Sequence, residues 1–216
     1  MLTELEKAVF QYIEEHREGM IDYLRRLVSV DTQTPPGLNY DRICDIMADR
    51  FSGLGCETSV HEAPQKYLDL SGADFLGLEG PRSNVVAVRR GNGGGPTLHI
   101  SAHIDCAAIQ EEGWSVDPLG GEITGESPHG RSLYDVGGGY IWGRGVADDK
   151  GECAAMTLAL EAIHELGVRL EGDLILTGNC DEEIGGVAGL GFLIKEGIVK
   201  ADMGIQLDGG LGGINL

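Results

Sequence analysis

Acidic side chains and one histidine stand directly after short apolar runs or tight turns at four places in the chain. The residues concerned are His103, Asp105, Asp148, Glu182, Glu183 and Asp208. Carboxylates gathered around a histidine repel one another unless a cation neutralises them. Oxygen and imidazole ligands without a thiolate suit zinc, with manganese or cobalt as alternatives. Two such ions that share a carboxylate can promote hydrolysis at a carbonyl carbon, so the pattern indicates a hydrolytic metal site.

Each of these residues also has a simpler interpretation. An isolated histidine such as His103 is more often a satisfied core residue, and Asp148 could favour the dipole of a following helix. Glu182 and Glu183 could lie in a solvated loop, and Asp208 could open the turn into the glycines that follow it. Their shared position favours the metal site, because ligands of open α/β sheets bind beyond the carboxyl ends of the strands.

The elements that would position these residues alternate between two periods. Apolar residues at steps of three and four predict helices over 3–29, 43–54, 150–166 and about 188–195. Short β-rich runs predict strands over 57–62, 84–90, 97–102, 173–178 and 203–208. The alternation predicts an α/β sheet covered by helices on both faces. The stretch 106–142 has no clear period and predicts an extended loop or hairpin that passes near the site.

Composition limits the class of protein. The 216 residues, of which 42% are hydrophobic, are enough for one domain with a sizeable core. No apolar run reaches the ~18 residues that a transmembrane helix needs, and the charged, helical N-terminus is unlike a signal peptide. The five widely spaced cysteines favour buried, reduced thiols in a cytoplasmic protein. A formal net charge of −19 argues against nucleic acid and anionic membranes as partners.

A nucleotide-binding domain is the alternative that the glycine-rich turns suggest. The turn GRGVAD at 143–148 lacks the spacing G-x-G-x-x-G, and the chain contains no P-loop lysine motif. The negative net charge also disfavours a phosphate ligand, so this interpretation is weaker than the metal site.

Four motifs carry a resemblance to a known family: HID at 103–105, GRGVADDKG at 143–151, DEE at 181–183 and LD at 207–208. In this order they resemble the zinc-dependent peptidase and deacylase family. That family includes aminoacylase, glutamate carboxypeptidase, acetylornithine deacetylase, succinyl-diaminopimelate desuccinylase and the carnosinase-like dipeptidases. The resemblance implies a three-layer α/β/α catalytic domain with a mixed, mostly parallel sheet. It also implies two divalent metal ions, zinc with cobalt or manganese as alternatives, and hydrolysis of an amide bond in a small peptide or N-acyl amino acid.

The resemblance assigns a role to each candidate residue. The metal ligands would be His103, Asp148, Glu183 and Asp208, with Asp148 bridging the two ions. Asp105 would hold the imidazole of His103 in its tautomer and orientation. Glu182 would be the general base that takes a proton from the metal-activated water and returns it to the leaving amine. The resemblance further implies a cis peptide bond between Asp148 and Asp149.

Two features of the family have no counterpart in the sequence. One is a further histidine ligand of the second metal ion, and the other is a lid domain that often dimerises. The remaining histidines match none of the family's ligand positions; they are His16, His61, His99, His129 and His164. Residues 1–216 are therefore expected to be the N-terminal part of the catalytic domain of a longer enzyme, and the resemblance leaves a homodimer open for that complete enzyme. The alternative is a catalytically incomplete metal-binding fragment that keeps the fold without turnover.

Overall fold

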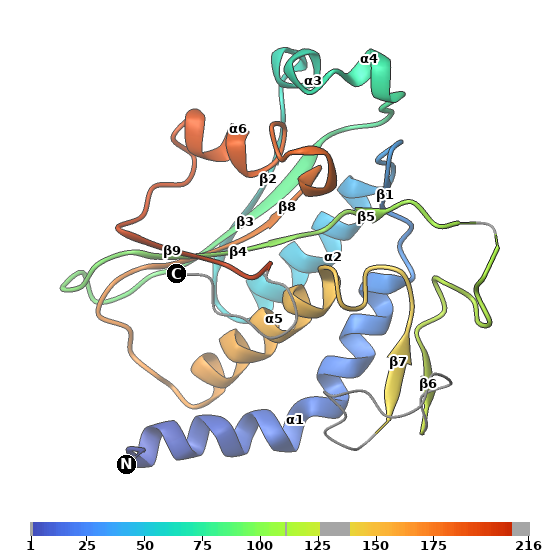
Figure 1. Ribbon diagram of the computed structural model, residues 1–216. Helices are drawn as coiled ribbons and strands as arrows, with labels where there is room; N and C mark the ends of the chain where they lie inside the picture. The colour runs from blue at the N-terminus through green and yellow to red at the C-terminus, as the bar shows by residue number, and fades with distance from the viewer. Residues whose placement is uncertain (1, 111, 126–138, 209–216) are drawn as a thin grey trace.

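A five-stranded mixed sheet forms the centre of the computed structural model, which describes residues 2–110, 112–125 and 139–208 (Figure 1). Its strands, in spatial order, are β2 (Glu57–Glu62), β3 (Ser83–Arg89), β8 (Leu174–Asn179), β4 (Leu98–His103) and β9 (Met203–Gln206). Strand β4 runs parallel to both β8 and β9, whereas β3 runs antiparallel to both β8 and β2. Only β3 therefore opposes the direction of the others, and the expected mixed α/β sheet is confirmed.

Helices cover both faces of this sheet. The larger helices are α1 (Glu4–Val28), α2 (Tyr40–Gly53) and α5 (Lys150–Glu165), and all three lie on the same side, below the sheet in Figure 1. There α2 packs against β2 and β3, α5 packs against β4, and α1 packs against α5. The other face carries α6 (Leu190–Lys195) and α3 (Gln65–Ser71). An edge-to-face contact joins these two helices, with 5.1 Å between the ring centroids of Tyr67 and Phe192. The three layers expected from the sequence are present.

The long first helix shows why the sequence folds in this way. Thr3 begins α1 with a capping box, in which its hydroxyl accepts from the Glu6 N–H and the Glu6 carboxylate accepts from the Thr3 N–H. Most of the helix is exposed, and only Leu24, Leu27 and Val28 near its end are buried. The C-terminal turns of α1 are therefore the part that anchors it to the core.

Several short elements were not predicted. Strand β1 (Gln33–Thr34) pairs in parallel with β5 (Cys106–Ala107), and α4 (Ala73–Leu76) follows α3.

Strands β6 (Glu122–Thr124) and β7 (Tyr140–Trp142) pair antiparallel. This pairing agrees with the hairpin expected within 106–142, although residues 111 and 126–138 of that stretch lie outside the described ranges.

The cysteines belong to the buried hydrophobic core. All five cysteines are buried and free, which confirms the predicted burial of the thiols. None of the helices in the described ranges combines the length and the apolar character that crossing a lipid bilayer requires.

Gly151, the second residue of α5, permits a close backbone approach next to the candidate site. A Cβ atom built on Gly151 would lie 2.3 Å from the carbonyl oxygen of Val146. We expect Gly151→Ala to lower the free energy of unfolding by about 1–3 kcal/mol, because the turn before the helix must move away. Gly19→Ala is the matched control: an added Cβ on this residue of α1 has nothing within 4 Å, so we expect a gain of about 0.5–1 kcal/mol. Urea unfolding of both variants checks this, and a wild-type midpoint for Gly151→Ala would contradict it.

Candidate metal centre

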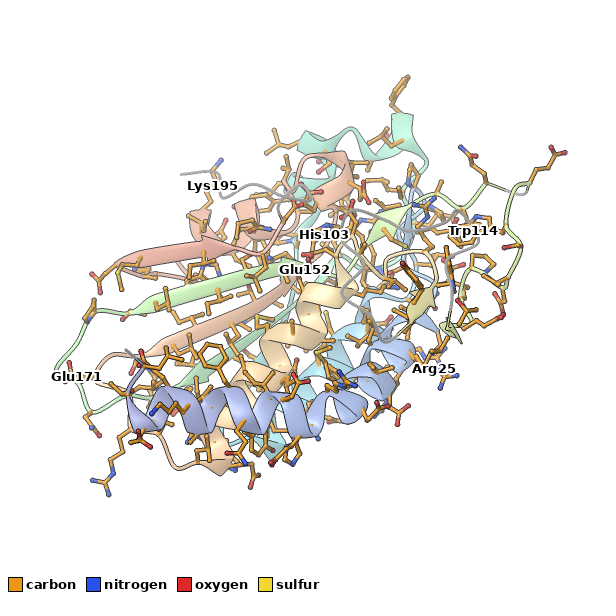
Figure 2. The ribbon with its side chains drawn as sticks, turned by 60° about the horizontal axis from the view of Figure 1, so that its bottom comes forward. Arg25, His103, Trp114, Glu152, Glu171 and Lys195 are labelled. Carbon is orange, nitrogen blue, oxygen red and sulfur yellow. The ribbon has the colours of Figure 1, made fainter. Side chains whose placement is uncertain are left out.

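His103 is the centre of the candidate site and ends strand β4. Figure 2 shows it in the middle of the molecule, where β4 ends close to the start of α5. Its side chain is fully buried, and its Nε2 atom lies 2.9 Å from Oδ1 of Asp148 and 3.9 Å from Oε2 of Glu182. The parallel register pairs His103 with Asn179 of β8, so the turn that follows β8 reaches the same edge of the sheet.

Three candidate residues place one potential ligand atom each within 4.8 Å of the others. They are His103, Glu182 and Asp208, from the ends of β4, β8 and β9. Asp148 joins them through its 2.9 Å contact with His103, and its side chain is 66% exposed. The structure therefore brings these four residues, which are distant in the sequence, together at one edge of the sheet. Among the described residues, this is the one group of three or more that could hold a metal ion.

Glu183 lies beside this group but points one oxygen at the backbone. Its Oε1 atom accepts a hydrogen bond of 2.7 Å from the N–H of Ala107 in β5. Burial, followed by the nearby charge of Asp148, raises the pKa of Glu183. The other carboxylate oxygen of Glu183 does not take part in this hydrogen bond.

Asp105 has a different set of contacts from the one expected. Its oxygens accept the backbone N–H groups of Glu182 and Glu183, at 3.1 and 3.2 Å. The Nδ1 atom of His103 is closer to the backbone carbonyl oxygen of Asp105 (3.0 Å) than to its carboxylate (3.4 Å). The buried Asp105 therefore holds the glutamate turn as well as the histidine, a double contact that the sequence did not indicate.

The turn at 143–151 is held by the two residues that follow Asp148. Asp149 is buried and accepts the backbone N–H of His103 at 2.8 Å, which ties the start of α5 to the end of β4. Lys150 is also buried, and its Nζ donates to the carbonyl oxygen of Val30 at 2.8 Å. The peptide bond between Asp148 and Asp149 is cis, as the resemblance implied.

The electrostatics of the group favour a bound cation. Burial lowers the pKa of His103, but the hydrogen bond and charge of Asp105, together with the charges of Asp149 and Asp148, outweigh burial and raise this pKa to about 10. Burial raises the pKa of Glu182, and the positive His103 opposes that rise while Asp208 adds to it. The carboxylates therefore attract positive charge to this point, and a divalent cation would compete with the histidine proton for it. Imidazole and carboxylate donors without a thiolate are a set that fits zinc, manganese or cobalt.

A buried ion pair beneath the glutamate turn was missed by the sequence analysis. Nε of Arg82 lies 2.9 Å from Oδ2 of Asp181, and both side chains are at most 1% exposed. The Tyr40 hydroxyl donates to the other oxygen of Asp181 at 2.9 Å, and Arg82 also donates to the carbonyl oxygens of Pro36 and Gly37. Asp181 has a positive φ of 60° and directly precedes Glu182. No sequence spacing relates Arg82 to Asp181, so only the fold could reveal the pair.

Comparison with known sequences gives one family and several relatives. The sequence profile of peptidase family M20/M25/M40 matches residues 99–212. The N-formyl-4-amino-5-aminomethyl-2-methylpyrimidine deformylase of Bacillus subtilis is 30% identical over 209 residues, which are 92% of this chain and 42% of that protein. The Beta-Ala-His dipeptidase of Rattus norvegicus is 28% identical over 192 residues, which are 85% of this chain and 35% of that protein. The chain thus spans less than half the length of these curated relatives.

Comparison with solved structures supports the fold. The crystal structure of human carnosine dipeptidase 1 matches with a TM-score of 0.74 and 24% sequence identity, over 96% of this chain and 42% of that chain. A metallo-carboxypeptidase of the M20 family from Sulfolobus solfataricus matches with a TM-score of 0.66 and 20% identity, over 91% of this chain and 38% of that chain. At these identities the likeness concerns the fold of the described domain.

Proposed function

Because the chain belongs to peptidase family M20/M25/M40, we propose that the complete protein is a metal-dependent hydrolase that cleaves an amide bond in a small peptide or N-acyl amino acid. The observation that carries this proposal is the group of His103, Glu182 and Asp208 at one sheet edge, with Asp148 against the histidine. The relatives named as a deformylase and a dipeptidase both cleave amides, which supports the reaction class.

The site would hold two divalent metal ions, zinc with cobalt or manganese as alternatives. The proposed ligands are His103, Asp148, Glu183 and Asp208. A bound ion supplies a Lewis acid that polarises a carbonyl oxygen and lowers the pKa of water. Asp148 would be the ligand that the two ions share; its side chain is 66% exposed, and its Oδ1 atom lies 2.9 Å from Nε2 of His103.

Glu182 would act as the general base and then as the general acid. Its carboxylate is half-exposed, lies 3.9 Å from His103 Nε2 and has a raised pKa, which brings it nearer to the pH at which it must exchange protons. It would accept a proton from the attacking water and donate that proton to the nitrogen of the leaving amine. Asp105 would fix the position of this carboxylate through the backbone N–H of Glu182.

We propose that residues 1–216 form the N-terminal part of the catalytic domain of a longer, cytoplasmic enzyme that forms a homodimer through its lid domain. The fraction of each relative that the chain spans supports the greater length of the complete protein. Strand β9 at the sheet edge also supports it, because Met203 and Ile205 are 50% and 48% exposed there. The rest of the catalytic domain would cover this edge and supply the further histidine ligand. A metal-binding fragment without turnover is the alternative, favoured by the lack of a second ligating histidine in the described site.

The proposed function is tested by measuring metal content and hydrolysis together. We expect the complete protein to contain divalent metal, to hydrolyse dipeptides or N-acyl amino acids, and to lose that activity on chelation and regain it with zinc, cobalt or manganese. His103→Ala should lower both metal content and activity, because it removes a buried imidazole ligand. Metal binding without hydrolysis of any amide would favour the non-enzymatic alternative, and a protein that binds no metal would contradict both.

A further inference from the structure

A cavity of about 560 Å³ opens directly beside the candidate metal centre. Its lining includes His103, Glu182 and Asp208 of that centre, together with residues of α3, the turn after β8 and α6. The volume falls in the range of small-molecule sites. The cavity is therefore large enough to take a substituent of a molecule whose reacting bond lies at the metal centre.

The outer walls of this cavity are apolar. They are formed by Leu70 of α3, by Val187, and by Leu190 and Ile194 of α6. Leu70 and Ile194 are 65% and 56% exposed, so apolar surface faces water on both sides of the same hollow. Exposed apolar side chains that line one concavity, rather than standing singly, are typical of a ligand site.

Two glycines belong to the lining of the cavity. Gly185 and Gly186 line it, and a Cβ atom built on either would have no heavy atom within 4 Å. At these two positions the lining therefore has no side chain that would take up space.

The described lining contains three charged residues besides His103. Glu182 and Asp208 belong to the metal centre. Lys195 is the last residue of α6, is exposed, and in Figure 2 extends away from the ribbon. The four apolar residues offer no partner to a charged substituent, which would lose its hydration against them without compensation.

We propose that this cavity, the α6 cavity, is the subsite for an uncharged aliphatic or aromatic group of the substrate, attached on one side of the amide bond that is cleaved. The inference rests on the proposed function. It adds that Leu70, Val187, Leu190 and Ile194 determine substrate preference. A small formyl or glycyl group on that side of the amide bond would leave the cavity unfilled.

The test compares dipeptides X-Gly and Gly-X with the complete protein, where X is Gly, Leu, Phe, Glu or Lys. We expect Leu and Phe to raise kcat/KM at least about 10-fold over Gly at one of the two positions, and Glu and Lys to give no such gain. Ile194→Asp should reduce this apolar preference about 10-fold, because a carboxylate would enter the wall. Leu166→Asp is the matched control: Leu166 is a 38% exposed leucine that follows α5 and is not part of the cavity, so its variant should keep the preference.

Each outcome is decisive. Hydrolysis without an apolar preference, or a preference that Ile194→Asp leaves unchanged, would overturn the α6 cavity as a subsite and leave the proposed function standing. If Ile194→Asp leaves the preference unchanged and also lowers the melting temperature of the protein, another part of the protein, and not the substrate, covers these walls. Metal binding without hydrolysis of any dipeptide or N-acyl amino acid would instead remove the proposed function. Should Ile194→Asp fail to fold, Leu190→Ala takes its place, because this variant only shortens one side chain of the wall. The measurement is then the ratio of kcat/KM for the Phe dipeptide to kcat/KM for the Gly dipeptide, and the same outcomes decide.

Discussion

Glu182→Gln should lower kcat of the complete protein by at least about 100-fold, with metal content close to that of the wild type. The amide has the size of the carboxylate but cannot accept the proton of the attacking water, and general acid–base catalysis contributes about 10²–10⁴-fold. The geometry makes this a demanding test, because Glu182 belongs to the three residues whose ligand atoms lie within 4.8 Å of one another. Rate measurements at saturating substrate and elemental analysis of the same preparations check both parts.

Glu183→Gln is the matched control for this prediction. The two glutamates are neighbours on one turn, and Asp105 holds the backbone N–H of each. If Glu183 is a ligand, its variant should lose metal from one of the two sites, and added metal should restore part of the activity. Equal loss of metal from both variants would show that the assignment of base and ligand is wrong.

Arg82→Met should lower the free energy of unfolding by about 3–5 kcal/mol, because it leaves the carboxylate of Asp181 buried without its cation. Arg82 and Asp181 are almost completely inaccessible to solvent, and the Tyr40 hydroxyl would be the main remaining partner of the acid. Arg90→Met is the matched control, since Arg90 pairs with Glu57 and Asp173 but is 61% exposed. Its loss should cost less than about 1 kcal/mol. Urea unfolding measures both.

The pH dependence distinguishes a lost charge partner from lost packing. Burial already raises the pKa of Asp181, and the charge of Arg82 opposes that rise. Removing Arg82 should raise this pKa further. A carboxyl whose pKa is higher in the folded than in the unfolded state gains stability as the pH falls through the folded value. The deficit of Arg82→Met relative to wild type should therefore shrink as the pH falls from neutral into the acidic range in which this carboxyl takes up its proton. A constant deficit would indicate packing alone, and the double variant Arg82→Met with Asp181→Leu should recover most of the loss.

The main strands and helices could be predicted because their signals are local. Strand β2 coincides with the predicted range 57–62, and α5 ends one residue before the predicted end at 166. The helices α3 and α4, seven and four residues long, were not predicted, because no helical period was recognised in 65–76. The pairing of β1 with β5 was missed because a two-residue strand has no alternation.

The candidate site could be predicted as a set of residues but not as a network of contacts. The position of His103, Asp148, Glu182 and Asp208 beyond strand ends follows from local patterns and the topology of α/β sheets. The contacts of Asp105 with the glutamate turn and of Arg82 with Asp181 depend on the register between distant strands. Register is set by tertiary packing, so no single stretch of the sequence contains that information.

The parallel pairing of β4 with β8 has a consequence for how the protein folds. The strands that carry His103 and the glutamate turn are separated along the chain by α5, so their pairing closes a long loop and is intrinsically slow. The ligand atoms cannot meet before that closure, and an ion that they hold would therefore bind the native state alone. Such binding stabilises the native state by mass action. The supply of metal would then govern the abundance of the folded protein as well as its rate of turnover.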